Sequence, residues 1–248
     1  MNDRLVTSRA STRRRYLTRA KPAFHGGLLA ALALFTGCAT ETLFKSNFDP
    51  TPINQPPAHV QEVGTANVDG PAGSVIVVVP PVTPSGKWVE VRRPNSQSPV
   101  AGLQGNFSQF RGEGVYTFSA ALFIPAGNGV ATIQFEPFNQ PVSTLTSFLH
   151  LDFMPDNRVR IDDKDATMFG SFPRNQPFIV QVTLKINAAA ATAKIVLSGA
   201  GASGQADYAI ISALLPVARQ FGAIRMWMGF PWTGAFDATN IVVTRRTD

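Results

Sequence analysis

PFIVQVTLKIN, the stretch Pro177–Asn187, alternates apolar and polar side chains along most of its length. The apolar set is Phe178, Val180, Val182, Leu184 and Ile186, and the polar set is Gln181, Thr183, Lys185 and Asn187. Because successive side chains of a β-strand point to opposite faces, this period of two predicts a strand with one buried and one solvent-facing side. The short segment Ala188–Ala191 joins it to a second predicted strand, Thr192–Ser198, and the two predict a hairpin.

Further strands are predicted on both sides of this pair. They are Ser74–Val79, Lys87–Arg92, Val115–Ile124, Val130–Glu136, Ser147–Phe153, Arg158–Asp162, Ala223–Phe230 and Thr239–Arg246. The turn residues PAGNG at 125–129 predict a hairpin between Val115–Ile124 and Val130–Glu136. Tyr208–Arg219 fits either a helical turn or a strand, and Pro216 excludes a long helix. Nine or ten short strands predict an antiparallel β-sandwich or barrel.

The net charge is concentrated at the start of the chain. The 248 residues contain 22 Lys and Arg against 16 Asp and Glu, a formal net charge of +6. Residues 1–37 hold seven basic side chains and one acidic side chain, which accounts for the whole excess, so residues 38–248 are balanced. A nucleic-acid-binding domain carries its basic groups on its folded surface. The distribution of charge therefore argues against a nucleic-acid partner.

Residues 1–37 have the parts of an export signal. The basic segment STRRRYLT, 11–18, resembles the twin-arginine export consensus, with Tyr and Thr at the positions of its Phe and Lys. The apolar run 26–37 is too short to span a bilayer as a helix, and an ordinary secretory signal is the alternative route. The run ends in LFTGC, 34–38, which resembles a bacterial lipobox, although Phe35 departs from it. The resemblance implies that Cys38, the only cysteine, carries a lipid.

A lipid on Cys38 would anchor the exported chain to a bacterial membrane. Ala39 is not the Asp that marks retention at the inner membrane, so the resemblance favours the outer membrane in a Gram-negative organism. Pro, Asn, Thr and Gly are frequent in the following segment, which predicts an extended tether, with an irregular packed strand over Phe48–Val60 as the alternative. The predicted organisation is a signal peptide at 1–37, a lipid-anchored tether at 38–72 and a β-sandwich domain at 73–248.

From about residue 70 to 246, the order of predicted strands resembles the concanavalin A-like lectin and glucanase superfamily. The matching features are the strand beginning at Gly114, the paired segments LHLD (149–152) and VRID (159–162), the hairpin beginning at Pro177, and the closing segment DATNIVV (237–243). The resemblance implies an all-β fold, a jelly-roll sandwich of antiparallel sheets. It suggests a glycan or a cell-envelope polysaccharide as the ligand, although one fold serves many functions.

One strand carries the nearest approach to a catalytic pattern. Hydrolases of this superfamily use E-x-D-x-x-E on one strand, which places two carboxylates beside the glycosidic bond. In the segment HLDFMPD, His150 and Asp152 share a face, but no Glu occupies either catalytic position and Pro155 ends the strand. The other histidines lie in the predicted signal and tether, which excludes a site of several histidines. We expect His150 and Asp152 to bind a ligand or to form a polar pair, with catalysis as an alternative.

The densest acidic cluster contains Asp162, Asp163 and Asp165. Carboxylate oxygens at close spacing are ligands that Ca²⁺ prefers, but a calcium site needs six to eight oxygens and this segment lacks the EF-hand pattern. The cluster therefore fits either a calcium site or a solvated turn. No other cofactor is indicated.

Tryptophans are candidates for stacking on sugar rings. The chain has Trp88, Trp227 and Trp232. In Ala223–Phe230, alternation places Ile224, Met226, Met228 and Phe230 on one face and Arg225 with Trp227 on the other. Large aromatic side chains are more often core than site, so packing of Trp227 in the core is the preferred interpretation. An Arg beside a Trp on an outward face, which would form a polar-ligand site, is the alternative.

Motifs of other enzyme classes are absent from the sequence, including G-x-S-x-G, the phosphate-binding loop, H-E-x-x-H and the dinucleotide fingerprint. The sequence therefore favours a lipid-anchored envelope protein whose sandwich binds a glycan without catalysis. The alternatives are a glycan-active hydrolase or lyase with an atypical site, and a structural envelope protein that binds other proteins.

Overall fold

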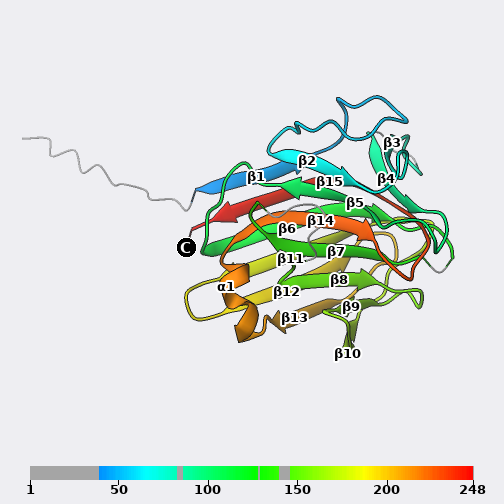
Figure 1. Ribbon diagram of the computed structural model, residues 1–248. Coiled ribbons are helices and arrows are strands. Elements are labelled where there is room, and N and C mark those ends of the chain that lie inside the picture. Colours follow the sequence, from blue (N-terminus) through cyan, green and yellow to red (C-terminus); the bar gives the residue numbers. More distant parts are fainter. Residues whose placement is uncertain (1–38, 83–85, 128, 140–145, 248) are drawn as a thin grey trace, which may run out of the picture. The chain divides into compact units, whose positions relative to one another are not determined.

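The computed structural model describes residues 39–82, 86–127, 129–139 and 146–247. This part of the chain forms two antiparallel β-sheets (Figure 1). In spatial order from one edge, sheet A contains β13 (Gln205–Ala209), β12 (Ala191–Ser198), β11 (Pro177–Ile186), β6 (Gly114–Phe123), β15 (Gly234–Arg246), β4 (Trp88–Arg93) and β3 (Val75–Val78), with β1 (Thr40–Ser46) paired to β15. Sheet B contains β10 (Lys164–Phe169), β9 (Val159–Ile161), β8 (Leu149–Phe153), β7 (Ala131–Pro137), β14 (Phe221–Met228), β5 (Ala101–Asn106) and β2 (Thr65–Asp69). The predicted antiparallel β-sandwich is confirmed.

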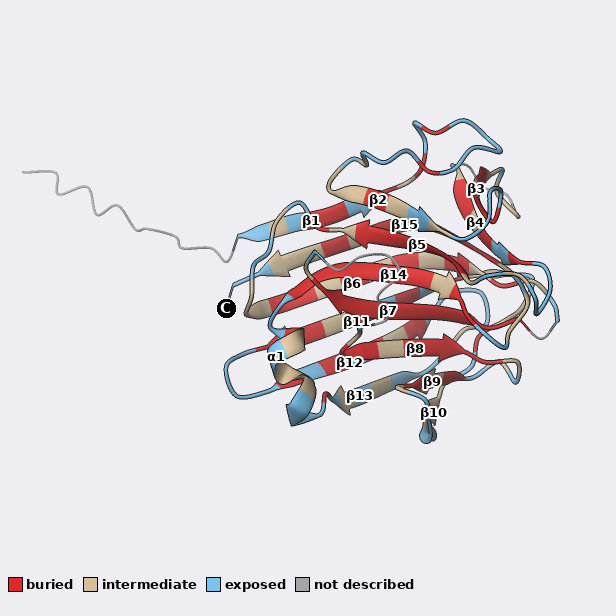
Figure 2. Ribbon diagram, viewed as in Figure 1, coloured by how far each residue is buried: buried red, intermediate tan, exposed pale blue. Residues whose placement is uncertain are grey.

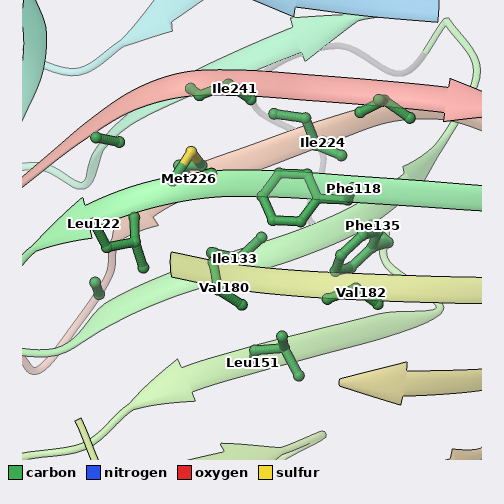
Figure 3. Packing of buried hydrophobic residues seen from close by; sticks show 14 of the residues in the cluster. Phe118, Leu122, Ile133, Phe135, Leu151, Val180, Val182, Ile224, Met226 and Ile241 are labelled. Atoms are coloured by element: carbon green, nitrogen blue, oxygen red, sulfur yellow. The ribbon is translucent and has the colours of Figure 1, made fainter. Parts of the chain in front are cut away.

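The core lies between the two sheets. The inward side chains of β11 that alternation predicted, Phe178, Val180, Val182, Leu184 and Ile186, are all buried. Figure 3 shows side chains of sheet A such as Phe118 and Val180 facing those of sheet B such as Ile133 and Met226. The Phe118 and Phe135 rings meet edge to face across the layer, with centroids 5.5 Å apart. Each fully buried side chain of this size contributes about 1.5–3 kcal/mol of hydrophobic free energy.

Strand pairing confirms one predicted hairpin and corrects another. β11 pairs with β12 from Ile179↔Ser198 to Ile186↔Ala191. The hairpin predicted between β6 and β7 is wrong, because β6 pairs with β11 and β15 in sheet A while β7 pairs with β8 and β14 in sheet B. The chain between them crosses from one sheet to the other. Arg174 holds this crossing, since its guanidinium donates to the carbonyls of Pro125 and Gly129 at 3.0 and 3.1 Å.

The sandwich begins well before residue 73. β1 pairs with β15 from Thr40↔Arg246 to Ser46↔Ile241, and β2 pairs with β5 in sheet B. Residues 39–72 therefore contribute strands to both sheets and do not form a separate tether. The physical reason is apolar burial, because Leu43, Phe44 and Phe48 are at most 1% exposed. The predicted signal peptide at 1–37 and Cys38 lie outside the described residues.

The segment Tyr208–Arg219 combines both interpretations left open by its sequence. β13 ends at Ala209, and a short 3₁₀ turn, η1 (Ser212–Leu214), leads into α1 (Leu215–Ala218). Pro216 lies in the first turn of α1, where its missing N–H costs no hydrogen bond. Among the described residues, no helix has the length and apolar character needed to cross a membrane.

Candidate functional site

Cross-strand register gathers polar side chains on the outer face of sheet B, the face turned away from the core. One row contains Asn67, Gln104, Arg225, Gln134 and His150, and the next contains Asp69, Gly102, Trp227, Thr132, Asp152 and Arg160. We call these two sets the polar rows. The structure therefore brings all four predicted ligand residues, His150, Asp152, Arg225 and Trp227, to one face. Trp227 is partly exposed there and does not lie in the core.

Arg225 is a buried cation at the centre of the polar rows. It is 0% exposed, and its Nη2 donates to Asp69 Oδ2 at 2.7 Å. Its Nη1 lies 4.0 Å from Glu136 Oε1, and its guanidinium lies 5.5 Å from the centre of the Trp227 ring. Burial raises the pKa of Glu136, while a hydrogen bond from Gln104 and the charge of Arg225 oppose that rise. The pair is thus held as a compensated charge network in a low-dielectric environment.

Several polar atoms of this region are buried without a hydrogen-bond partner in the described part of the chain. They are Asn106 Nδ2, Gln134 Oε1, Glu136 Oε1, Arg225 Nε and Nη1, and Trp227 Nε1. All of β7 and nearly all of β14 are buried (Figure 2). Buried polar groups in proteins are normally satisfied, so this set of donors and acceptors marks a place where buried water would complete the hydrogen bonds.

Asp152 is fixed on both of its oxygens. Thr132 Oγ1 donates to Oδ1 at 2.7 Å, and Arg160 Nη2 donates to Oδ2 at 2.9 Å. His150 Nε2 lies 3.9 Å from the same Oδ2 and 3.1 Å from Asp163 Oδ2. A carboxylate held in this way by a guanidinium is a positioned anion rather than a free base or nucleophile. The arrangement is suited to hydrogen bonding and orientation.

The predicted calcium residues form a hairpin turn beside this group. Asp162 and Asp163 both have positive φ, 51° and 57°, and connect β9 to β10 as the central residues of a tight turn. Asp162 Oδ1 accepts the backbone N–H of His150 at 2.8 Å. Asp163 Oδ1 and Asp165 Oδ1 lie 2.9 and 3.6 Å from the guanidinium of Arg160.

An acidic cluster is therefore present, but its charge is already compensated. Ligand atoms of His150, Asp152 and Asp163 lie within 4.8 Å of one another. Arg160 contacts two of these three residues, so its guanidinium stands where a cation would be held. Ca²⁺ takes six to eight oxygen ligands, and a guanidinium already paired with these carboxylates would repel it. In this geometry the residues do not fit a calcium ion while Arg160 remains in place.

Sequence reasoning missed several members of the polar rows. Thr132, Gln134 and Glu136 are three polar residues at alternate positions of a strand that is otherwise apolar, and this signal could have identified them. Asp69 and Gln104 belong to β2 and β5, two strands that the alternation did not predict. Arg160 lies on a predicted strand, and only the fold shows that it faces Asp152.

Comparison with known proteins defines the class of fold. No family model matches the sequence, and no curated protein is similar to it. Arcelin-5, a lectin-like defence protein from Phaseolus vulgaris, matches with a TM-score of 0.50 at 9% identity, over 85% of this chain and 99% of that chain. Lectin II from Ulex europaeus gives 0.49 at 10% identity, over 85% and 99%. At these identities the likeness is one of fold, and the predicted concanavalin A-like jelly roll is confirmed.

Proposed function

We propose that the sandwich binds carbohydrate at the polar rows without catalysing a reaction. The observation that carries the proposal is the partly exposed ring of Trp227 on the same sheet face as the partly exposed polar side chains of His150 and Arg160. Sugar hydroxyls donate and accept hydrogen bonds, so they can pair with both of these side chains. The ring supplies the apolar surface on which a sugar face packs.

The arrangement of carboxylates supports binding rather than glycoside hydrolysis. In the register of β7 and β8, Asp152 lies opposite Thr132, four residues along the strand from Glu136. Both oxygens of Asp152 already accept hydrogen bonds, Oδ1 from Thr132 and Oδ2 from Arg160. Glu136 is 0% exposed, and its Oε2 accepts a hydrogen bond from Gln104 at 2.7 Å. Neither carboxylate is therefore free to act on a glycosidic bond as a nucleophile or a general base.

A glycan array tests the proposal with the chain from residue 39, with and without Ca²⁺. We expect binding without release of product, and loss of binding in Trp227→Ala. The matched control is Phe230→Ala, because Phe230 is an exposed aromatic side chain, at 74% exposure, outside the polar rows. Equal binding by Trp227→Ala, or no binding to any glycan by folded protein, would reject this site. Product release that is lost in Asp152→Asn would establish an enzyme instead.

We also propose that the chain is exported and anchored by a lipid on Cys38, in the outer membrane if the organism is Gram-negative. The support is the lipobox-like segment LFTGC, and only Ala39 separates it from β1. Metabolic labelling with a radioactive fatty acid should label the full chain, with the label in the membrane fraction. Cys38→Ser should lose the label and leave the membranes. Retention of label in Cys38→Ser would reject the anchor while leaving the glycan proposal intact.

A further inference from the structure

The outer face of sheet A carries a second ordered set of polar side chains. Register places Thr42, Thr244, Thr117, Thr183, Lys194 and Asp207 in one row and Thr40, Arg246, Val115, Lys185, Thr192 and Ala209 in the next. We call these the threonine rows. They cross six adjacent strands, from β1 to β13, so they extend about 24 Å at the usual strand spacing of about 4.8 Å.

The threonine rows are hollowed along much of their length. A hollow of 510 Å³ lies over β11, β12 and β13, and its lining includes Thr183, Lys185, Thr192, Lys194 and Asp207. A second hollow of 290 Å³ is lined by Thr40, Val115, Thr117, Thr183, Thr244 and Arg246. Thr183 lines both, so the two hollows are neighbours along the threonine rows, and we call them together the trough. This trough lies on the opposite side of the sandwich from the polar rows.

The trough has a local excess of positive charge. Lys185, Lys194 and Arg246 are its cations, and Asp207 is its one carboxylate. Within the described part of the chain, neither Lys185 nor Lys194 forms an ion pair with an acidic side chain, and both are exposed. The residues after 37 are balanced in charge, so this excess belongs to the face rather than to the domain. Two ammonium groups are thereby available to an anionic ligand.

We propose that the threonine rows bind an acidic polysaccharide whose sugars carry carboxylates. Each threonine hydroxyl donates and accepts, so the four threonines of the first row and the two of the second match the hydroxyls of a polysaccharide lying across the strands. The lysines pair with the carboxylates. Among the described residues that line the two hollows, Tyr208 is the one aromatic residue, whereas surfaces for single-stranded nucleic acid use several aromatic rings to stack successive bases.

Calorimetric titration with polygalacturonate tests the inference on the chain from residue 39. All described strands lie in this part and pair only with one another, so it contains the complete sandwich. Residues 1–37 are omitted because their excess of seven bases over one acid would itself bind a polyanion. We expect Lys185→Gln/Lys194→Gln to weaken binding at least tenfold and to reduce its dependence on salt, since exposed charge pairs are screened at high ionic strength.

Matched variants distinguish binding in this trough from binding at another surface of the sandwich. Lys45→Gln is the control, because Lys45 pairs with Glu62 at 2.6 Å and lies on sheet A outside the threonine rows. Thr183→Val should weaken binding with an unchanged melting temperature. Trp227→Ala should bind polygalacturonate as the parent does, whether or not the polar rows bind a glycan.

The proposal is overturned if the double lysine variant binds as tightly as the parent, or if the parent fails to bind. Equal binding of neutral dextran or oligothymidine would overturn it as well.

Discussion

At the scale of single residues, the buried charge network of sheet B is the feature with the largest energetic consequence. Arg225 and Glu136 are both 0% exposed, and Arg225 also pairs with Asp69. A buried ion pair adds little net stability, but removal of one partner leaves the other charge uncompensated. The network therefore fixes the geometry of the polar rows and makes each of its members costly to replace singly.

Replacement of Arg225 by methionine tests this reasoning. We expect Arg225→Met to lower the free energy of unfolding by about 3–5 kcal/mol, because it leaves Glu136 buried without its cation. Urea denaturation measures the effect. The double variant Arg225→Met/Glu136→Gln should recover a substantial part of the lost free energy of unfolding, since it also removes the uncompensated charge of Glu136. A double variant as unstable as the sum of the two single variants would contradict the coupling.

Asp237 makes stability depend on pH. It lies on β15 opposite Glu90, is 7% exposed, and its Oδ1 has no hydrogen-bond partner in the described part of the chain. Burial, followed by the charge of Glu90, raises the pKa of Asp237 from 3.8 to about 7. The folded state thus binds this proton more tightly than the unfolded state, so stability falls as pH rises from 3.8 to about 7.

Asp237→Asn should remove this part of the pH dependence. At about 1.4 kcal/mol per pKa unit, the shift corresponds to at most about 4 kcal/mol. We therefore expect the variant to be more stable than the parent at pH 8, by about 2–4 kcal/mol, and to differ little from it at pH 4. Thermal unfolding over this range measures the difference. A parent whose melting temperature stays level between these pH values would show that Asp237 titrates normally.

At the scale of elements, the end of β14 positions the tryptophan of the candidate site. Gly229 follows β14, and a Cβ at this position would collide with the six-membered ring of Trp227. Gly229→Ala should therefore displace the ring without changing the core. We expect glycan affinity to fall nearly as far as in Trp227→Ala, with a loss of stability below about 1 kcal/mol. An array comparison and a melting curve measure both, and unchanged affinity would show that the ring position does not matter.

Alternation predicted individual strands well where one face is apolar, as in β6, β11 and β12. It missed β5, whose sequence AGLQGN contains two glycines that obscure the period. Gly105 is required there because a Cβ would lie within 2.7 Å of the Phe44 ring, a residue from β1. That contact joins segments about sixty positions apart, so no local pattern reveals it. The partners of β6 and β7 are long-range in the same sense, which is why turn residues alone predicted the wrong hairpin.

At the scale of the whole molecule, the candidate site could be predicted only in part. Period-two alternation within single strands identified His150 with Asp152 and Arg225 with Trp227 as pairs on common faces. The two pairs lie in common rows only because of the register between β8, β7 and β14, and these strands come from distant parts of the chain. The balance of charge at the acidic turn likewise depends on Arg160, whose position opposite Asp152 is a property of the folded sheet.

The position at which the sandwich begins leads to a test on the whole molecule. A chain from residue 73, the start of the sequence-predicted domain, lacks β1 and β2 and exposes the edges of both sheets. It also loses Phe44 and Phe48 from the core, and removal of one such buried aromatic side chain costs about 3–5 kcal/mol. A folded domain is stable by only about 5–15 kcal/mol. We therefore expect the chain from residue 73 to be unfolded or aggregated, and the chain from residue 39 to unfold cooperatively.

Circular dichroism and size-exclusion chromatography distinguish the two chains, with Phe44→Ala in the longer chain as an intermediate case. Equal melting temperatures for both chains would mean that β1 and β2 pack on a sandwich that is already complete without them.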